Sequence, residues 1–191
     1  MNEKAINKTM QLSDLYSTQA ALIVSELNSL ILYCRENGLR ISSWYGRFDL
    51  TGKENSSERI NRGYGYRPIE GAVDDRNFPW FLYWEIVWVT INAAFNKGEK
   101  VLDLGGSSSL FSYYLASKGF NVTTVDLNSA LVDNANSVAK ITGWNLRNFI
   151  MDMKELNFNE QFNHITSICV YSYPFVHRNM LVNTYRRYMI K

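Results

Sequence analysis

The chain has 191 residues, of which 46% are hydrophobic and 20% are charged, and its formal net charge is +2. This length suits one α/β core with an N-terminal extension and is short for two domains. The composition is that of a folded, soluble protein rather than a disordered or fibrous one. The small net charge does not provide the positive field that nucleic-acid binding usually needs, so we expect no nucleic-acid partner.

Three features of the sequence bear on where the protein works. Cys34 and Cys169 lie far apart, each inside an apolar stretch, which favours buried reduced thiols and a cytoplasmic location. Residues 78–95 are aromatic and almost long enough to span a bilayer, but a proline, a glutamate and an asparagine interrupt them. Residues 1–9 are polar and lack the pattern of a secretory signal. We therefore predict neither export nor a membrane partner.

Residues 1–77 are predicted to form an N-terminal extension. Apolar residues recur at helical spacing from Ser13 to about Asn37, and Gly38 is the expected C-cap. Residues 39–77 have no such period, and their tyrosines and arginines are consistent with either a substrate lid or an aromatic loop packed over a core. A second helix is predicted from Phe78 to about Phe95.

Residues 78–170 are predicted to form the core domain. From Val101 onward short apolar segments alternate with segments of helical periodicity, which is typical of a parallel sheet with helices packed on it. Glycines close the two helical segments, as expected for C-caps. The predicted strands are Lys100–Leu104, Asn121–Val125, Arg147–Met151 and His164–Val170, and the predicted helices are Leu110–Lys118 and Ser129–Ile141.

A turn of small residues follows the first predicted strand. The segment Gly105-Gly106-Ser107-Ser108-Ser109 leads from this strand into a helix that begins at Leu110. Small side chains let backbone amides approach a ligand closely, and the helix N-terminus adds a partial positive charge. A strand, a glycine turn and a helix are a weak signal when they stand alone.

Three carboxylates at the ends of successive strands strengthen this signal. Asp103 lies two residues before Gly105, and Asp126 follows the second strand. Asp126 is placed to accept hydrogen bonds from both hydroxyls of a ribose. Asp152 ends the third strand, where it can bond an exocyclic amine while Met153 packs on a purine. Together these residues predict a cleft for an adenosine cofactor.

Two adenosine cofactors compete for this cleft. A dinucleotide fold needs glycine at the third fingerprint position, where this chain has Leu110. Asp103 would repel a pyrophosphate but attract an ammonium group. A cationic amino-acid nucleoside therefore fits better than NAD, and an NAD-type oxidoreductase is the less favoured alternative.

The stretch from Glu99 to Val170 resembles the class I S-adenosylmethionine-dependent methyltransferases. Its strand and turn are similar to the first motif of that family, in which acidic-x-Gly-x-Gly-x-Gly follows an apolar strand. Here Asp103 and Gly105 keep the pattern, and serines replace the two later glycines. The resemblance implies a Rossmann-like parallel sheet of order 3-2-1-4 with S-adenosylmethionine as cofactor.

The resemblance also implies roles for individual residues. The methionine portion of the cofactor would lie on the turn, the ribose on the second strand and the adenine on the third. No catalytic base matches, no metal is expected, and a small molecule is the predicted methyl acceptor. The implied cofactor residues are Asp103, Gly105, Gly106, Ser107, Asp126, Leu127, Asp152 and Met153.

The end of the chain departs from the family pattern. In that family a helix, a fifth strand and a hairpin follow the fourth strand, whereas residues 171–191 hold four basic side chains and no acid. We therefore expect an incomplete sheet followed by an atypical basic tail, as in a truncated enzyme. A catalytically inactive fragment that acts as a binding or structural module is the alternative.

Overall fold

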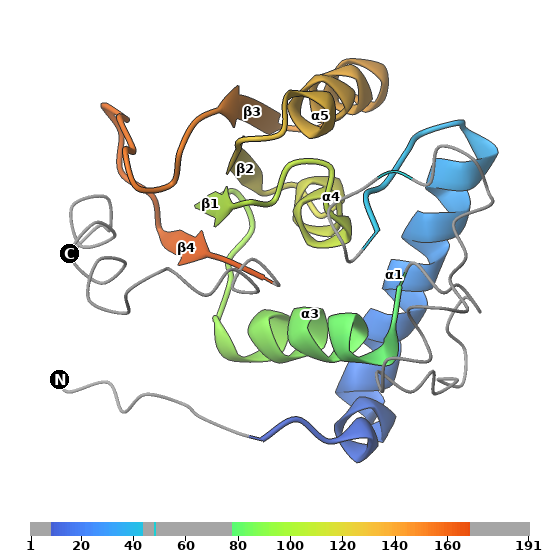
Figure 1. The fold of residues 1–191 in the computed structure, drawn as a ribbon. Helices are drawn as coiled ribbons and strands as arrows, with labels where there is room; N and C mark the ends of the chain where they lie inside the picture. The colour runs from blue at the N-terminus through green and yellow to red at the C-terminus, as the bar shows by residue number, and fades with distance from the viewer. Residues whose placement is uncertain (1–8, 44–47, 49–77, 169–191) are drawn as a thin grey trace, which may run out of the picture.

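The computed structural model describes residues 9–43, 48 and 78–168 (Figure 1). The predictions for Cys169, for the aromatic loop and for the basic tail 171–191 lie outside these residues. The element order begins with two N-terminal helices and continues as an alternation of strands and helices. The elements are η1 Leu12–Tyr16, α1 Thr18–Glu36, α3 Trp80–Asn92, β1 Lys100–Leu104, α4 Leu110–Ser117, β2 Asn121–Asp126, α5 Ser129–Thr142, β3 Leu146–Ile150 and β4 His164–Thr166.

The four strands form one parallel sheet in the order β3-β2-β1-β4. This confirms the predicted Rossmann-like order 3-2-1-4. The register pairs Leu104 with Val125 and Asp126 with Ile150, so the strand ends lie side by side. Within the described residues β4 has three residues and lies at one side of the sheet, where the sequence predicted a longer strand.

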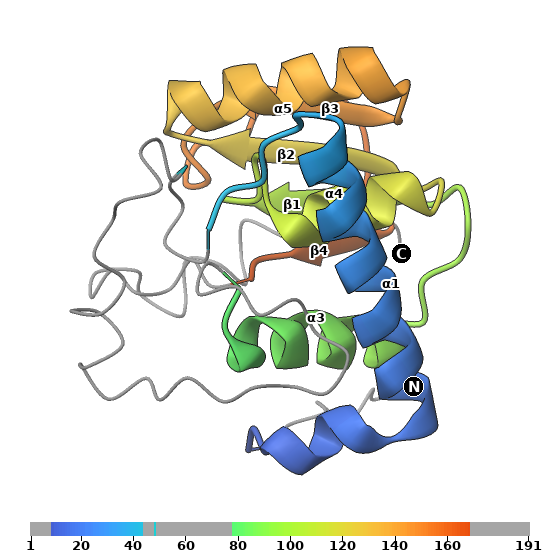
Figure 2. The same ribbon diagram turned by 90° about the vertical axis from the view of Figure 1, so that its right-hand side faces the viewer.

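The two faces of the sheet are covered differently. The helices gather on one face, where α4 and α5 pack on the strands and α1 runs across the outside of α4 (Figures 1 and 2). The segment 151–163 covers the opposite face (Figure 1). There Leu156 and Phe162 pack with Leu102, Leu104 and Val125 in a small second cluster. Alternation along β1 thus sends Leu102 and Leu104 to this face, and Val101 to the helical face.

The N-terminal helices share the main hydrophobic core with the sheet. One continuous cluster contains residues of η1, α1, α3, α4 and the strands. Buried polar contacts support this docking: the Tyr83 hydroxyl donates to Asn28 Oδ1 at 2.9 Å, and Trp84 Nε1 donates to Asp14 Oδ2 at 2.8 Å. The extension is therefore packed into the same core as the sheet.

The aromatic segment that the sequence placed near the length of a bilayer forms α3, with 13 residues. Across the described part of the chain, no helix combines the length and apolarity needed to span a membrane. Trp84 is buried in α3 and stacks on Trp88, with ring centroids 5.3 Å apart. The tryptophans of this helix thus serve packing.

Candidate functional site

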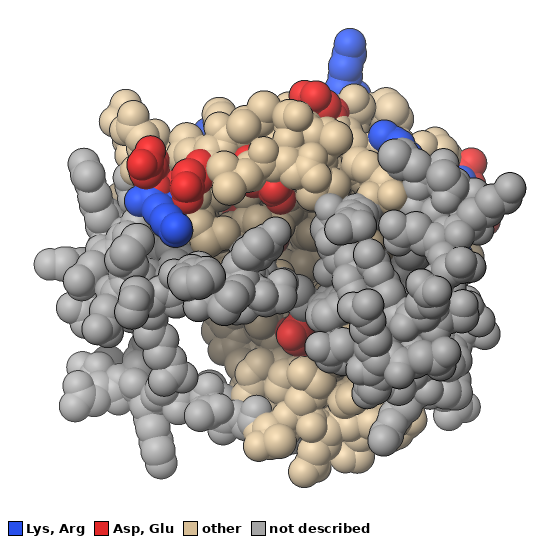
Figure 3. Space-filling model, viewed as in Figure 1, with Lys and Arg blue, Asp and Glu red and all other residues tan. Residues whose placement is uncertain are grey.

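The carboxyl ends of β1, β2 and β3 bring the three predicted aspartates to one edge of the sheet. Asp103 is the fourth residue of β1, Asp126 is the last of β2, and Asp152 follows β3 closely. Figure 1 looks onto this edge, and Figure 3 shows the same side with acidic side chains near a hollow in the surface. The negative charge of Asp126 raises the pKa of Asp103, so these two carboxylates lie close enough to interact electrostatically.

The glycine turn is built as the sequence predicted, but not all of its amides are free. Gly105 has a φ of 71°, the left-handed region that glycine adopts without strain. Its N–H donates to the Val125 carbonyl at 2.7 Å, which ties the turn to β2. Ser109 then caps α4, since its side chain accepts from the Ser112 N–H at 3.0 Å. Gly105 therefore shapes the turn through its backbone conformation.

Gly106 is held over the carboxylate of Asp103. A Cβ on Gly106 would lie 1.9 Å from Asp103 Oδ2 and 2.8 Å from Ser112 Oγ. Asp103 is 1% exposed and accepts hydrogen bonds from Ser112 Oγ at 2.6 Å and from Thr166 Oγ1 at 2.9 Å. The carboxylate thus forms the floor beneath the turn, and glycine is the residue that lets the turn lie on it.

This burial changes the acidity of Asp103. Loss of solvent raises the pKa of its carboxyl to about 6, although the hydrogen bonds from Ser112 and Thr166 oppose the shift. The nearby charge of Asp126 raises it further. A cation above the turn would stabilise the ionised form, because a charge buried in a low-dielectric floor is poorly screened.

Asp126 and Leu127 stand at the open end of β2. One carboxylate oxygen of Asp126 accepts from the Asn128 N–H at 2.9 Å, and burial raises the pKa of this carboxyl. Leu127 is 70% exposed, and Ile150, the partner of Asp126 in the register, is 59% exposed. Exposed apolar side chains beside a carboxylate provide the mixed surface that a ribose and a purine require.

Asp152 and Met153 lie just beyond β3. Asp152 Oδ1 accepts from the Lys154 N–H at 2.8 Å, an Asx-type turn that fixes the carboxylate. Met153 packs against the small cluster on the far face of the sheet. The structure thus brings both residues to the same edge as Asp126, while their contact with adenine stays a prediction.

The sequence reasoning did not identify the polar chain behind the turn. Ser107 Oγ and Thr124 Oγ1 are 2.7 Å apart, Thr124 donates to Asn148 Oδ1 at 2.8 Å, and Asn148 donates to Asn136 Oδ1 at 3.1 Å. Ser107, Thr124 and Asn148 are all buried. The polar residues Thr124 in β2 and Asn148 in β3 were the signal that the sequence offered, because an apolar core does not need them.

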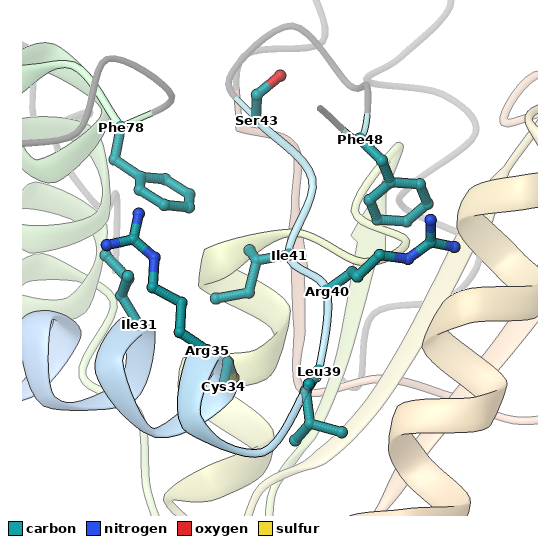
Figure 4. Close-up of a pocket in the computed structure, with 10 residues that line it drawn as sticks. Ile31, Cys34, Arg35, Leu39, Arg40, Ile41, Ser43, Phe48 and Phe78 are labelled. Carbon is teal, nitrogen blue, oxygen red and sulfur yellow. The ribbon is translucent and has the colours of Figure 1, made fainter. Parts of the chain in front are cut away.

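A cavity of about 280 Å³ lies between α1 and the segment that follows it. Figure 4 shows its walls: Ile31 and Arg35 come from α1, and Phe78 lies beside Arg35. Ile41 and Arg40 belong to the segment that follows α1, and Arg40 extends toward α5. The same segment contacts the glycine turn through the Ser42 N–H, which donates to the Ser108 carbonyl at 2.8 Å.

The residues at the strand ends fit a cationic adenosine cofactor. They provide a buried negative floor at Asp103, a carboxylate with exposed apolar neighbours at Asp126, and a turn without bulky side chains. In the described ranges no group of three or more His, Cys, Asp or Glu is arranged to hold a metal ion. The sheet order, together with these residues at the strand ends, matches the fold of the class I S-adenosylmethionine-dependent methyltransferases.

A sequence comparison narrows this class to one family. The model of the family described as tellurite resistance protein TehB matches residues 88–186, which is more than half of the chain. The chain belongs to this family. No curated protein sequence gives a significant match.

Several solved structures are similar to part of this chain. The MccD protein is 23% identical over 56% of this chain and 48% of its own, with a TM-score of 0.48. TehB from Haemophilus influenzae is 21% identical over 71% of this chain and 42% of its own, with a TM-score of 0.46. A TehB-like SAM-dependent methyltransferase from Corynebacterium glutamicum is 22% identical over 52% and 53%, with a TM-score of 0.41. The chain thus spans about half the length of these structures.

Proposed function

We propose that this chain binds S-adenosylmethionine at the carboxyl edge of its sheet and transfers the methyl group to a small-molecule acceptor. The observation that carries the proposal is the convergence of Asp103, Asp126 and Asp152 with the glycine turn on one edge. Membership of the TehB family supports the same conclusion. A cytoplasmic location remains a prediction from the cysteine pattern.

The cofactor would supply an electrophilic methyl group on a sulfonium, and the protein would bind and align it. Asp103, below the turn, would attract the ammonium group through its buried charge. The carboxylate of Asp126 would accept from the ribose hydroxyls, with Leu127 against the adenine. Asp152 and Met153 would frame the other side of the base.

Methyl transfer requires a nucleophile on the acceptor, in line with the breaking bond between methyl carbon and sulfur. The new bond forms from an electron pair of the acceptor, and the neutral thioether S-adenosylhomocysteine leaves. The family description names tellurite resistance, so tellurite is the first acceptor to test. Catalysis would rest on proximity, because none of the described residues is assigned as a general base.

Calorimetric titration with S-adenosylhomocysteine tests the binding half of this proposal. We expect Asp126→Ala to weaken binding by about 10- to 100-fold, since hydrogen bonds to a charged group contribute roughly 1.5–3 kcal/mol each. Asp133→Ala is the matched control, because Asp133 is exposed on α5 and away from the strand ends. Equal affinity in the wild type and the Asp126 variant would disprove the ribose role.

The alternatives give different outcomes in the same experiments. Heat with NAD and none with S-adenosylhomocysteine would favour an oxidoreductase. Binding of S-adenosylhomocysteine without methyl transfer to tellurite or to a panel of small thiols and amines would favour an inactive binding module. If the chain binds neither S-adenosylhomocysteine nor NAD, a structural role is the alternative that is left.

A further inference from the structure

The side chain of Ser108 is the centre of a buried polar contact that no cofactor role explains. Ser108 is 0% exposed, and its hydroxyl donates to the Leu131 carbonyl at 2.6 Å. The same oxygen accepts from Asn134 Nδ2 at 2.9 Å and from the Tyr113 hydroxyl at 3.3 Å. A serine hydroxyl has one proton and two lone pairs, so this one is fully used.

The backbone at Ser108 is strained, which shows that these contacts hold it. Its φ is 62°, in the left-handed region that costs a non-glycine residue roughly 1–2 kcal/mol. Such a conformation persists only where the surroundings over-determine it. Ser108 lies inside the glycine turn, so the contacts that hold it also set the shape of the cofactor side of the site.

Asn134 joins this point to the N-terminal extension. Its Nδ2 donates to the Arg40 carbonyl at 2.8 Å as well as to Ser108. Beside it, the Ser42 N–H donates to the Ser108 carbonyl at 2.8 Å. The segment Leu39–Ser43 is therefore bonded to the turn directly and through a side chain of α5.

The other side of this segment lines the cavity shown in Figure 4. Leu39 and Ile41 form part of its wall, with Ile31 and Phe78 across from them. One short stretch of chain thus contacts the cofactor turn on one side and an adjoining cavity on the other. Few hydrogen bonds therefore connect the turn to the cavity wall.

We propose that Asn134 is a positioning residue that couples the cofactor turn to the cavity wall formed by Leu39–Ser43. This inference rests on the proposed function, because the cofactor is the ligand that orders the turn. Binding of the cofactor at the turn then stabilises the wall, and by reciprocity the docked wall strengthens cofactor binding. The cavity wall is complete only when the segment Leu39–Ser43 is docked.

The helix itself does not depend on Asn134. α5 has its own N-cap in Asn128, and Gly143 ends it with a left-handed φ of 70°. Alanine is the better helix former, so Asn134→Ala is not expected to unfold α5. Asn134→Asp keeps the shape of the side chain but cannot donate to the Arg40 carbonyl. Ser137→Ala, one turn along α5, is the matched control because Ser137 bonds only within its own helix among the contacts described.

Amide hydrogen exchange measured by NMR, with and without S-adenosylhomocysteine, tests the coupling. In the wild type and in Ser137→Ala, the ligand is expected to slow exchange of the Ser42 amide about fivefold or more, the lower end of usual coupling. The Ala93 amide, which donates to the Val89 carbonyl at the end of α3 and lies outside the segment Leu39–Ser43, is the internal reference. In Asn134→Ala and Asn134→Asp the slowing at Ser42 is largely but not wholly lost, because the direct bond to the Ser108 carbonyl remains, and calorimetry shows S-adenosylhomocysteine binding several-fold more weakly.

The outcomes separate this inference from the proposed function. If the wild type binds S-adenosylhomocysteine and the Ser42 amide does not respond, the coupling is wrong and the function stands. A response that survives undiminished in both Asn134 variants overturns the role of Asn134. If the Ser42 amide exchanges faster in the Asn134 variants both with and without ligand, while the affinity for S-adenosylhomocysteine is unchanged, then the hydrogen bond from Asn134 to Arg40 is merely structural. If the wild type does not bind the ligand, the proposed function and the inference both fail.

Discussion

At the scale of single residues, Gly106 shows how the floor of the site constrains the turn above it. Alanine at this position would place a Cβ 1.9 Å from Asp103 Oδ2, and that carboxylate is buried and bonded to two hydroxyls. We expect Gly106→Ala to lower the free energy of unfolding by about 3 kcal/mol or more, since neither partner can move away easily.

Urea unfolding checks this expectation, with Gly143→Ala as the comparison. Gly143, unlike Gly106, has a left-handed φ of 70°, and nothing lies within 4 Å of a Cβ placed there. Its substitution is expected to cost only about 1 kcal/mol, the price of the backbone conformation. Equal losses in the two variants would show that the contact with Asp103 does not limit the turn.

The buried carboxyl of Asp103 makes stability depend on pH in an unusual direction. Its pKa is raised from 3.8 to about 6, chiefly by burial, so the folded state holds this proton more tightly than the unfolded state. The protonated Asp103 carboxyl therefore contributes to the free energy of unfolding in full below about pH 4, and this contribution is lost as pH rises toward 6. Relative to Asp103→Asn, the wild type is expected to lose on the order of 3 kcal/mol across this window.

The measurement is the free energy of unfolding of both proteins between pH 4 and 7. Subtracting the variant removes the contribution of the other acidic groups. A difference that stays constant with pH, or grows in favour of the wild type, would mean that Asp103 ionises normally in the fold. Added S-adenosylhomocysteine should reduce the loss, because an ammonium group near the floor stabilises the ionised carboxylate.

At the residue scale, the sequence predicted the positions that depend on the local backbone pattern. The sequence placed Asp103, Asp126 and Asp152 at strand ends, and all three lie there because position in a strand depends on local pattern. The contact between Gly106 and Asp103 was not predictable, since it depends on how the turn folds back over the strand. Asn134 carried no signal, because its partners are distant in sequence and come from tertiary packing.

At the scale of elements, α1 is fastened to the core by a polar contact as well as by apolar packing. Glu26 on α1 accepts from the Tyr114 hydroxyl at 2.7 Å and pairs with Lys118 at 2.6 Å, both contributed by the α4 region. Burial alone would raise the pKa of Glu26, but the bonds from Lys118 and Tyr114 outweigh it and lower the pKa. The ionised Glu26 therefore stabilises the fold above pH 4.5, and this stabilisation is lost as pH falls below that value.

Replacing Glu26 should therefore loosen the docking of α1. We expect Glu26→Ala to lower the free energy of unfolding at pH 7 by about 1 kcal/mol, because it leaves the nearly buried Tyr114 hydroxyl without its acceptor. Glu36→Ala, an exposed change on the same helix, is the control. The difference between the two variants should shrink at pH 3.5, and a difference independent of pH would contradict the ionic contribution.

Elements with strong periodicity were predicted well. β1 has the predicted bounds Lys100–Leu104, and α5 begins at Ser129 as expected, because alternation and caps are local signals. The sequence merged η1 and α1 into one helix, since the extended Ser17 between them lies within a continuous apolar pattern. The predicted fourth strand ran to Val170, whereas β4 ends at Thr166 within the described residues.

At the scale of the whole molecule, one core joins the extension to the sheet. The main cluster includes Leu27 of α1, Tyr83 of α3 and Val101 of β1, all buried. The sequence predicted the extension and the sheet separately, because helical periodicity does not reveal which surface a helix will cover. A shared core implies that the described parts unfold together, and that a ligand at the strand ends stabilises the extension too.

Thermal unfolding followed by two signals tests this cooperativity. Tryptophan fluorescence reports chiefly on α3, which holds Trp80, Trp84 and Trp88, whereas far-ultraviolet circular dichroism reports on all the helices and strands. At a concentration 100 times its Kd, S-adenosylhomocysteine should add about 2.7 kcal/mol and raise Tm by roughly 5–10 °C in both signals. NAD should cause no shift. A rise seen by circular dichroism alone would show that α3 unfolds independently of the sheet, because a ligand bound to one cooperative unit must raise Tm for every part of it.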